Sequence, residues 1–297
     1  MNEHPEQVIR DREPEISIGL PVYNGARFLE QALQSLLQQS YRDLELIISD
    51  NASSDSTPEI CAHYSTRDAR IRYVRQRKNI GAPRNWSLVA TLARGRFFKW
   101  ASVNDLVSPD MLEKCVAVLR ARPDAVLAYG RTCLMDEESG AKALYAGDFA
   151  LDDLRPSDRF EHLLRSLELN NAQSGLIKVS ALRETGLDRP YAGGDVPLMA
   201  ELALRGTFVL IPDVLLFRRM GPRTFSRGLE GCKAEEFYGS RSSNVVRVVR
   251  RTIDYSSSVL TARIEVREKF RALRCLARHA WWDAVGLLRS SNGSAGP

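Results

Sequence analysis

The residues best suited to chemistry in this 297-residue sequence are acidic side chains that directly follow apolar segments. Asp50 ends one such segment, and Asp105 comes shortly after another. The four histidines are far apart in the sequence, so a histidine relay or a histidine-based zinc site would require a coincidence of folding. We therefore expect acidic groups to do the chemistry.

Several common catalytic motifs are absent from the sequence. The first apolar segment is not followed by GxGxxG, and no GxxxxGK[ST], HExxH or GxSxG occurs. These absences argue against a typical dinucleotide site, a P-loop, a zinc protease helix and a nucleophile elbow.

Strand-like and helix-like segments alternate in the first half of the chain and would position these acidic groups. Apolar runs of strand length alternate with amphipathic helical patterns, which is typical of a mostly parallel sheet flanked by helices. Ligands bind such sheets beyond the carboxyl ends of the strands, so polar residues that follow the strands mark a site. The expected strands are Ile16–Leu20, Leu44–Ser49, Ile71–Arg75, Phe97–Ala101 and Ala125–Tyr129.

The composition is that of an ordinary globular protein, with 44% hydrophobic and 27% charged residues. The net charge of +5 is too weak to indicate a nucleic-acid partner but is compatible with a phosphate-bearing ligand. The five cysteines form no CxxC pair, and neither a secretory signal nor a membrane-spanning segment is evident. These features favour a cytoplasmic protein.

The second half of the chain is less regular. Helical patterns are expected at 160–169 and 195–205, and strand-like segments at 207–211 and 214–217. From about residue 233, arginines alternate with apolar positions and Trp281-Trp282 follow, which predicts basic amphipathic helices and a flexible tail. Such helices could lie on anionic lipid at the inner face of a membrane, or pack on the rest of the chain or on a second subunit of a homo-oligomer.

Five segments of the sequence resemble family 2 glycosyltransferases. Residues 16–24 and 44–55 resemble the family's opening segments, 79–85 its N-x-G-x-x-x-N segment, and 104–113 its acidic metal motif. Residues 194–206 resemble its acceptor-side acidic motif. The resemblance implies a GT-A fold with a Rossmann-like, mostly parallel central sheet. It also implies inverting transfer from a nucleotide-diphospho-sugar, a UDP-sugar being favoured, to a hydroxyl of a glycan or lipid-linked acceptor in polysaccharide synthesis.

The resemblance implies a role for each matching residue. Asp105 would hold Mn²⁺ or Mg²⁺ on the diphosphate. Because one carboxylate remains in this motif, either the metal affinity is lower or the side-chain carbonyl of Asn104 also serves as a ligand. Asp195 would act as the general base that deprotonates the acceptor. The expected contacts with the nucleotide-sugar are Pro21, Tyr23, Asn24, Asp50, Arg84, Asn104 and Asp105.

The sequence departs from the family pattern at two positions, which keeps other readings open. A single carboxylate remains in Ser102-Val103-Asn104-Asp105, and Gly194 stands where relatives usually have an acid. A non-catalytic nucleotide-sugar-binding or scaffold protein is therefore the alternative function. A sugar-nucleotide pyrophosphorylase is disfavoured, because its basic, glycine-rich first loop is missing. Asp195 also suits a helix N-cap, and Asn85 a structural role.

The expected organisation is one glycosyltransferase domain followed by a helical extension. The domain covers 14–232, with a nucleotide-sugar half at 14–130 and an acceptor half at 131–232. The extension covers 233–297.

Overall fold

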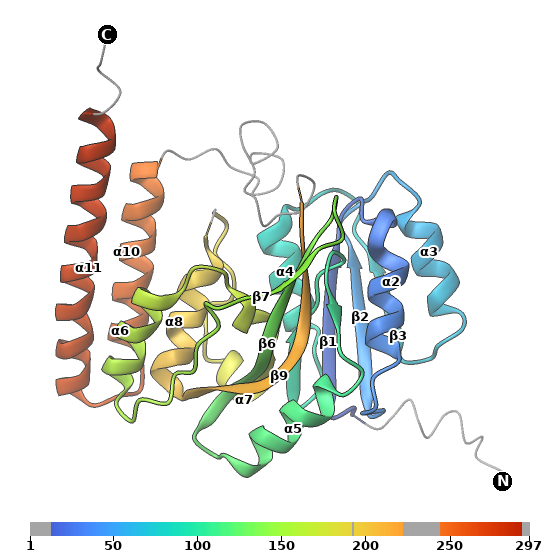
Figure 1. Ribbon diagram of the computed structural model, residues 1–297, viewed down its shortest axis with the longest axis horizontal. Coiled ribbons are helices and arrows are strands. Elements are labelled where there is room, and N and C mark those ends of the chain that lie inside the picture. Colours follow the sequence, from blue (N-terminus) through green and yellow to red (C-terminus); the bar gives the residue numbers. More distant parts are fainter. Residues whose placement is uncertain (1–12, 192, 222–243, 293–297) are drawn as a thin grey trace.

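The structure is a computed structural model that describes residues 13–191, 193–221 and 244–292, with side chains described as far as residue 279. Within these residues nine strands form one curled sheet in the order β3-β2-β1-β4-β8-β6-β9-β5, and β7 pairs with β6 (Figure 1). The strands are β1 Ile16–Val22, β2 Leu44–Asp50, β3 Ile71–Arg75, β4 Phe97–Trp100, β5 Leu106–Val107, β6 Ala125–Asp136, β7 Lys142–Leu144, β8 Leu176–Lys178 and β9 Thr207–Met220.

Strands β1 to β4 form the parallel part of the sheet, as the alternating pattern predicts. Every residue of β1 and β2 is buried, which explains why both segments are almost continuously apolar in the sequence. At Gly19 a Cβ atom would come within 2.6 Å of the Val89 side chain. This close approach allows a helix to pack tightly on one face of β1.

Helices cover both faces of the sheet, and each face has its own hydrophobic core. Ile18 and Leu20 of β1 pack with α2 and α5 on one face, whereas Phe98 and Trp100 pack on the other. The helices are α2 Ala26–Leu37, α3 Thr57–Ser65, α4 Ala82–Thr91, α5 Met111–Ala121, α6 Pro156–Ser166, η1 Asn171–Ser174, α7 Val179–Leu182, α8 Asp195–Arg205, α10 Asn244–Thr261 and α11 Val266–Asn292.

Strand β9 differs from the sequence expectation. The two short strands expected at 207–211 and 214–217 are one long strand that runs parallel to β6. Pro212 and Asp213 interrupt the apolar pattern and are exposed, and the register shifts beside them between Gly130 and Arg131. An irregularity of this kind absorbs the extra residues without ending the strand. The long strand brings its end, near Met220, to the loop after β4.

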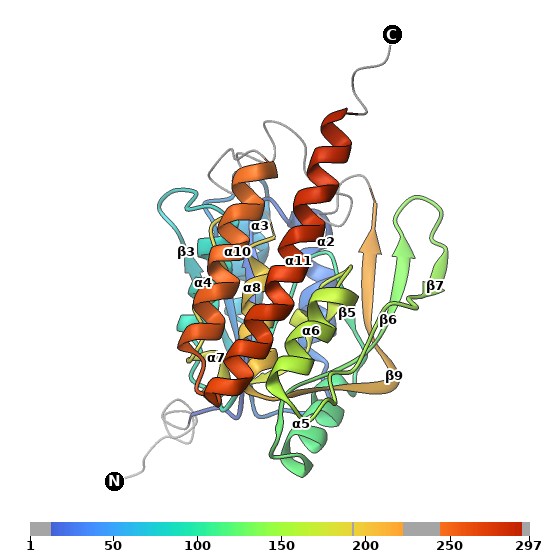
Figure 2. The ribbon, with the colours of Figure 1, turned by 90° about the vertical axis from the view of Figure 1, so that its left-hand side faces the viewer.

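The two C-terminal helices lie side by side as an outer layer over α8 and α6 (Figure 2). Tyr255 and Val259 of α10, with Ala272 and Leu276 of α11, are buried in the same core as α8. The packing of one apolar stripe on the rest of the chain is thus confirmed. The side chains of Trp281 and Trp282, the boundary at 232–233 and the tail from 293 lie outside the described residues. In the part of the chain that is described, no helix is long and apolar enough to cross a membrane.

Candidate functional site

A cleft of about 470 Å³ opens at the carboxyl ends of β1, β2 and β4. Asp105, from the loop after β4, and Asp195, the first residue of α8, both line this cleft although they are far apart in the sequence. Among the residues expected from the sequence, the cleft is lined by Pro21, Tyr23, Asn24, Asn104, Asp105 and Asp195, but not by Asp50 or Arg84.

Hydrogen bonds between loops hold the first wall of the cleft. Asn24 has a positive φ of 49°, and its side chain accepts a hydrogen bond from the Ser54 N–H at 2.9 Å. The Asn51 amide group donates to Asn79 at 2.7 Å and accepts from the Ile80 N–H at 2.8 Å. The loops after β1, β2 and β3 are therefore fixed by amide side chains that also line the cleft.

Asp50 lies beneath this wall. Its side chain is fully buried, and its carboxylate accepts hydrogen bonds from the Ser53 N–H at 2.9 Å and from the Tyr73 hydroxyl at 3.0 Å. The Arg75 guanidinium lies 3.4 Å from the same carboxylate. The structure thus places Asp50 as a support for the loop, and its neighbour Asn51 lines the cleft instead.

The structure also shows where two residues of the N-x-G-x-x-x-N segment lie relative to the cleft. Arg84 is exposed on α4 and is not among the residues that line the cleft. Asn85 is buried, accepts a hydrogen bond from the Ser49 hydroxyl at 2.6 Å and donates one to the Ser49 carbonyl at 2.9 Å. The structural role weighed for Asn85 therefore accounts for its side chain, although the residue also borders the cleft.

The Asp105 carboxylate is positioned by the end of β9. Its Oδ1 atom accepts a hydrogen bond from the Arg219 N–H at 3.1 Å. Burial raises the pKa of the Asp105 carboxyl, although the positive charge of Arg218 and the Arg219 N–H oppose this effect. Arg218 itself lines the cleft and donates to Asn171 at 2.6 Å. The surroundings of Asp105 are therefore positively charged, as a diphosphate requires.

The Arg219 side chain contacts other groups, and these contacts fix the loop after β4. It donates to the Asn104 carbonyl at 3.2 Å and to Gln31 at 3.0 Å, and it stacks 4.1 Å above the ring centre of Phe28. These contacts connect the end of β9, the loop after β4 and α2.

A second wall of the cleft is formed by the start of η1, the loop before α8 and Asp195, whose neighbours include the amide side chain of Asn170. The Oδ2 atom of Asp195 accepts a hydrogen bond from Asn170 at 2.7 Å. Asn170 also donates to Gln173 at 3.3 Å, and Gln173 donates to a further cleft carboxylate, Asp188, at 3.2 Å. Burial and the negative charge of Asp195 raise the pKa of Asp188 well above its ordinary value.

The backbone immediately before Asp195 explains the departure from the family pattern at Gly194. A Cβ atom on Gly194 would lie 2.1 Å from the Arg189 carbonyl oxygen, because Arg189 N–H donates to the Gly194 carbonyl at 3.0 Å across a tight loop. No side chain fits at this position. The nearby acid on this wall comes instead from Asp188, on the other side of the loop.

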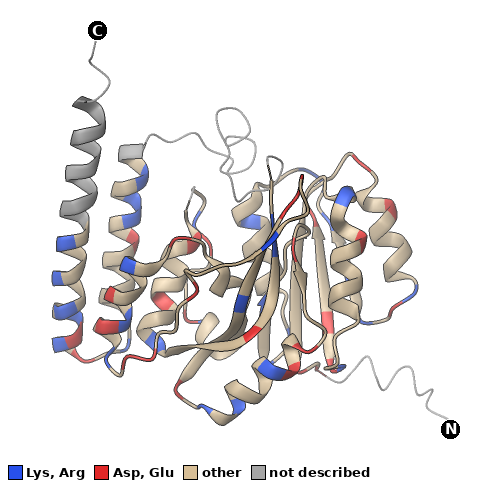
Figure 3. Cartoon of the chain, in the orientation of Figure 1, with Lys and Arg blue, Asp and Glu red and all other residues tan. Residues whose placement is uncertain are grey.

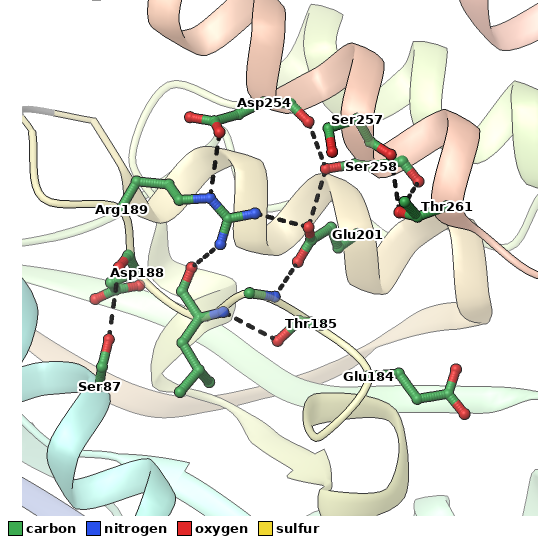
Figure 4. Close-up of polar contacts among 12 residues, drawn as sticks. Ser87, Glu184, Thr185, Asp188, Arg189, Glu201, Asp254, Ser257, Ser258 and Thr261 are labelled. Carbon is green, nitrogen blue, oxygen red and sulfur yellow. Dashed lines mark hydrogen bonds and ion pairs between the residues drawn. The ribbon is translucent and has the colours of Figure 1, made fainter.

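A polar network connects this loop to the C-terminal helix α10 (Figure 4). Arg189 donates to Glu201 at 2.8 Å and lies 3.5 Å from Asp254 of α10. Asp254 also accepts a hydrogen bond from the Tyr191 hydroxyl at 2.5 Å. The Ser258 hydroxyl of α10 donates to the buried Glu201 at 3.0 Å. Because Arg189 and Tyr191 line the cleft, α10 supports its second wall.

The sequence reasoning missed most of this second wall. Asn170 and Gln173 belong to a short polar run between an apolar helix and the apolar strand β8, and that concentration of amides was an available signal. Asp188 carried no comparable signal, because it stands alone in a loop. The cleft residues without an assigned role in the sequence analysis include Asn51, Trp86, Asn170, Gln173, Asp188 and Tyr191.

The residues around Asp105 fit a divalent cation that is shared with a diphosphate. Within the described residues no group of three or more His, Cys, Asp or Glu side chains could hold a metal ion alone. Asp105 does, however, line the cleft, and among the described residues its Oδ2 atom accepts no hydrogen bond. Mg²⁺ and Mn²⁺ bind through one or two carboxylates together with phosphate oxygens, so one carboxylate is sufficient.

Comparison with known sequences adds independent findings. A family model described as "Glycosyl transferase family 2" matches residues 17–174. The chain is 28% identical over 141 residues to the glycosyltransferase GlyG of Streptococcus pneumoniae, covering 47% of this chain and 46% of that protein. It is 29% identical over 134 residues to a chondroitin synthase of Escherichia coli, covering 45% of this chain and 19% of that protein. The chain thus spans less than half the length of these two relatives.

Solved structures show the same fold. Residues 1–349 of Staphylococcus aureus TarS in complex with UDP-GlcNAc match with a TM-score of 0.65 and 14% identity, covering 89% of this chain and 72% of that one. The Pyrobaculum calidifontis mannosyltransferase PcManGT in complex with GDP-Man and Mn²⁺ matches with a TM-score of 0.53 and 16% identity, covering 97% and 77%. The predicted α/β fold, with its helix-flanked central sheet, is confirmed.

Proposed function

The chain belongs to glycosyl transferase family 2 and is a glycosyltransferase, and from this premise we propose that it transfers a sugar from a nucleotide-diphospho-sugar to an acceptor hydroxyl with inversion. The favoured donor is a UDP-sugar, and the acceptor is a glycan or a lipid-linked glycan. The main supporting observation is that Asp105 and Asp195, which are 90 residues apart in the sequence, line the same cleft.

The wall formed by the β1, β2 and β3 loops would bind the donor. Tyr23, which is 38% exposed, offers an aromatic face for the nucleoside base, and Asn24 and Asn51 offer amide groups. Asp105 and the Asn104 side-chain carbonyl would hold Mn²⁺ or Mg²⁺, which when bound stabilises negative charge on the leaving diphosphate. Arg218 adds a fixed positive charge beside the same oxygens.

The second wall, which contains Asp195, would bind and activate the acceptor. The Asp195 carboxylate is held by Asn170, so its second oxygen can accept the proton of the attacking hydroxyl. The oxygen–carbon bond forms as the bond between the anomeric carbon and the diphosphate breaks. A single displacement of this kind, with one base and no carboxylate nucleophile, inverts the anomeric centre.

Similarity to the family and to a chondroitin synthase supports a role in polysaccharide synthesis. We place that role in the cytoplasm, at the inner face of the membrane where lipid-linked acceptors would be reached. A nucleotide-sugar-binding protein without catalysis is the alternative, because the metal motif retains one carboxylate.

Donor hydrolysis in the presence of Mn²⁺ tests the proposal. The wild type should release nucleoside diphosphate from at least one common nucleotide-sugar, and Asp105→Ala should slow this release by roughly 100-fold or more. Asp110→Ala is the matched control, because Asp110 is a half-buried acid that pairs with Lys114 and does not line the cleft.

Thermal shift with UDP and Mn²⁺ separates binding from catalysis. Asp195→Asn should retain the stabilisation by UDP, whereas Asp105→Ala should lose it. UDP stabilisation without release from any donor would favour the non-catalytic alternative. Release that persists in Asp105→Ala would contradict the proposed role of this carboxylate.

A further inference from the structure

The exposed apolar side chains are concentrated on the C-terminal helices. Nine large apolar side chains are exposed among the described residues, and six of them belong to α10 and α11. Isolated exposed apolar residues are ordinary, but a concentration on one face indicates an interaction surface. The six are Val246, Val249, Ile253, Leu260, Val266 and Phe270.

Each of these helices has a second apolar stripe, opposite the one that packs on the protein. On α10 the exposed residues Val249, Ile253 and Leu260 recur at helical spacing, whereas Tyr255 and Val259 on the other side are buried. The two helices form the outer layer of the molecule, with α8 and α6 behind them (Figure 2). We call this outer apolar surface, formed by the six residues named above, the outer face.

Helix α11, like α10, has an exposed apolar stripe opposite its buried one. Val266 and Phe270 are one helical turn apart and are 68% and 66% exposed, whereas Ala272 and Leu276 are buried against the protein. Packing on the rest of the chain therefore does not use these side chains.

The charge around the outer face is positive. Between residues 246 and 279 the two helices and their connecting loop contain nine basic and three acidic residues, and the basic residues recur along both helices (Figure 3). Asp254 accepts from Tyr191, and Glu268 is buried, accepts from Ser157 and pairs with Arg271. Arg263 and Arg278 pair with Glu184 and Glu161, so the positive charge is an excess that such ion pairs reduce in part. Glu265 remains on the outside, paired with Arg267.

We propose that the outer face of α10 and α11 docks on the surface of a membrane that contains anionic lipid. The apolar stripes would enter the boundary between headgroups and acyl chains, and the arginines would meet the negative headgroups. A two-fold contact with a second copy would instead place the same arginine-rich surface against itself, and like charges would oppose it. The inference goes beyond the transfer reaction, since docking can be measured without donor or acceptor.

Co-sedimentation of the full chain with vesicles tests this surface. The wild type should bind vesicles of phosphatidylglycerol and phosphatidylcholine more tightly than vesicles of phosphatidylcholine alone, and added salt should weaken binding. Ile253→Asp and Phe270→Asp should each reduce binding about tenfold, because a large apolar side chain is no longer buried in lipid. Leu144→Asp is the matched control: it lies on β7 and is 56% exposed.

Three results would overturn the proposal. One is equal binding to both kinds of vesicle, or to neither. Another is a loss of binding in Leu144→Asp as large as in Ile253→Asp. The third is a dimer in sedimentation equilibrium that Ile253→Asp converts to a monomer, which would make the outer face a contact between copies. Thermal unfolding of each variant shows whether its fold is intact.

Discussion

Asp188 and Asp195 line the same cleft, and the amide side chains of Gln173 and Asn170 connect them. Burial and the negative charge of Asp195 disfavour ionisation of the Asp188 carboxyl, and the positive charge of Arg189 offsets this only in part. A folded protein that keeps such a pair loses stability when both are ionised. The pair is therefore better explained by what it binds than by what it contributes to folding.

Asp188→Asn should stabilise the protein near neutral pH. The pKa of Asp188 is raised in the folded state, so the ionised carboxylate costs about 1.4 kcal/mol for each unit of that shift, and the amide avoids the cost. The cost is absent below the unfolded pKa and develops as the pH rises through the folded pKa. The gain should therefore appear in thermal unfolding at pH 7 and disappear near pH 3.

The charged groups that face Asp188 are Asp195 and Arg189. Thermal unfolding of Asp195→Asn at pH 7 and near pH 3 therefore provides the control. That substitution removes the repulsion from the other side and should lower the pKa of Asp188. A less stable Asp188→Asn variant at pH 7 would contradict this account.

At the scale of elements, the start of α8 depends on the absence of a side chain at Gly194. The helix begins at Asp195, and the preceding loop closes on itself through the backbone of Arg189 and Tyr191. The φ of Gly194 is −69°, an ordinary value, so the requirement for glycine is steric.

Gly194→Ala should lower the free energy of unfolding by about 1–3 kcal/mol, because the new methyl group would overlap the Arg189 carbonyl oxygen. The loop must then open, which moves Asp195 and should also slow donor hydrolysis. Chemical denaturation and the hydrolysis assay measure the two effects.

Gly140→Ala is the control for this substitution. Gly140 has a φ of 69° in the turn between β6 and β7, and a Cβ atom there meets no atom within 4 Å. Its replacement should lower stability through backbone strain and leave hydrolysis unchanged. Equal hydrolysis in Gly194→Ala and the wild type would refute the steric argument.

At the scale of the whole molecule, the C-terminal helices are part of the cleft's support. Asp254→Asn removes the negative charge that holds Arg189 and Tyr191, and should cost about 1.5–3 kcal/mol of stability. The loop at 186–194 would open more often, so its backbone amides should exchange hydrogen faster. Hydrogen–deuterium exchange with mass spectrometry measures this change.

Glu265→Gln is the matched control from the loop between the same two helices, since Glu265 is exposed and, within the described residues, its carboxylate pairs with Arg267. It should leave exchange in the loop unchanged. If Asp254→Asn left it unchanged as well, α10 would not support the cleft.

The parallel half of the sheet was predictable because strands that are buried on both faces appear in the sequence as short, mainly apolar runs. The run at 71–75 matches β3 fully, and Asp195–Arg205 matches α8, since apolar spacing and flanking glycines mark its bounds. Polar residues after these strands pointed to the cleft, and several of them line it, such as Tyr23, Asn24 and Asn104. Asp50 and Asn51 show the limit: both follow the same strand, and which one faces the cleft depends on hydrogen bonds to Tyr73 and Ser53.

The second wall of the cleft, which contains Asp188 and Asp195, was less predictable because it depends on contacts between distant segments. Asp188 is positioned by the loop that contains it. The next residue, Arg189, contacts Glu201 and also Asp254, which is 66 residues after Asp188 in the sequence. The outer stripes of α10 and α11 illustrate the same limit. Their sequence shows many apolar positions, but only packing decides which of them are covered.

The pairing of β5 with β9 has a consequence for synthesis on the ribosome. Leu106 and Val107, which directly follow Asp105, find their partners at Phe217 and Leu216, and the Asp105 carboxylate receives the Arg219 N–H. A nascent chain can therefore complete the neighbouring parallel strands long before this loop acquires its final form. The corner around Asp105, where we propose that the diphosphate binds, can form only after β9 has been synthesised, so an unfinished polypeptide lacks this part of the cleft.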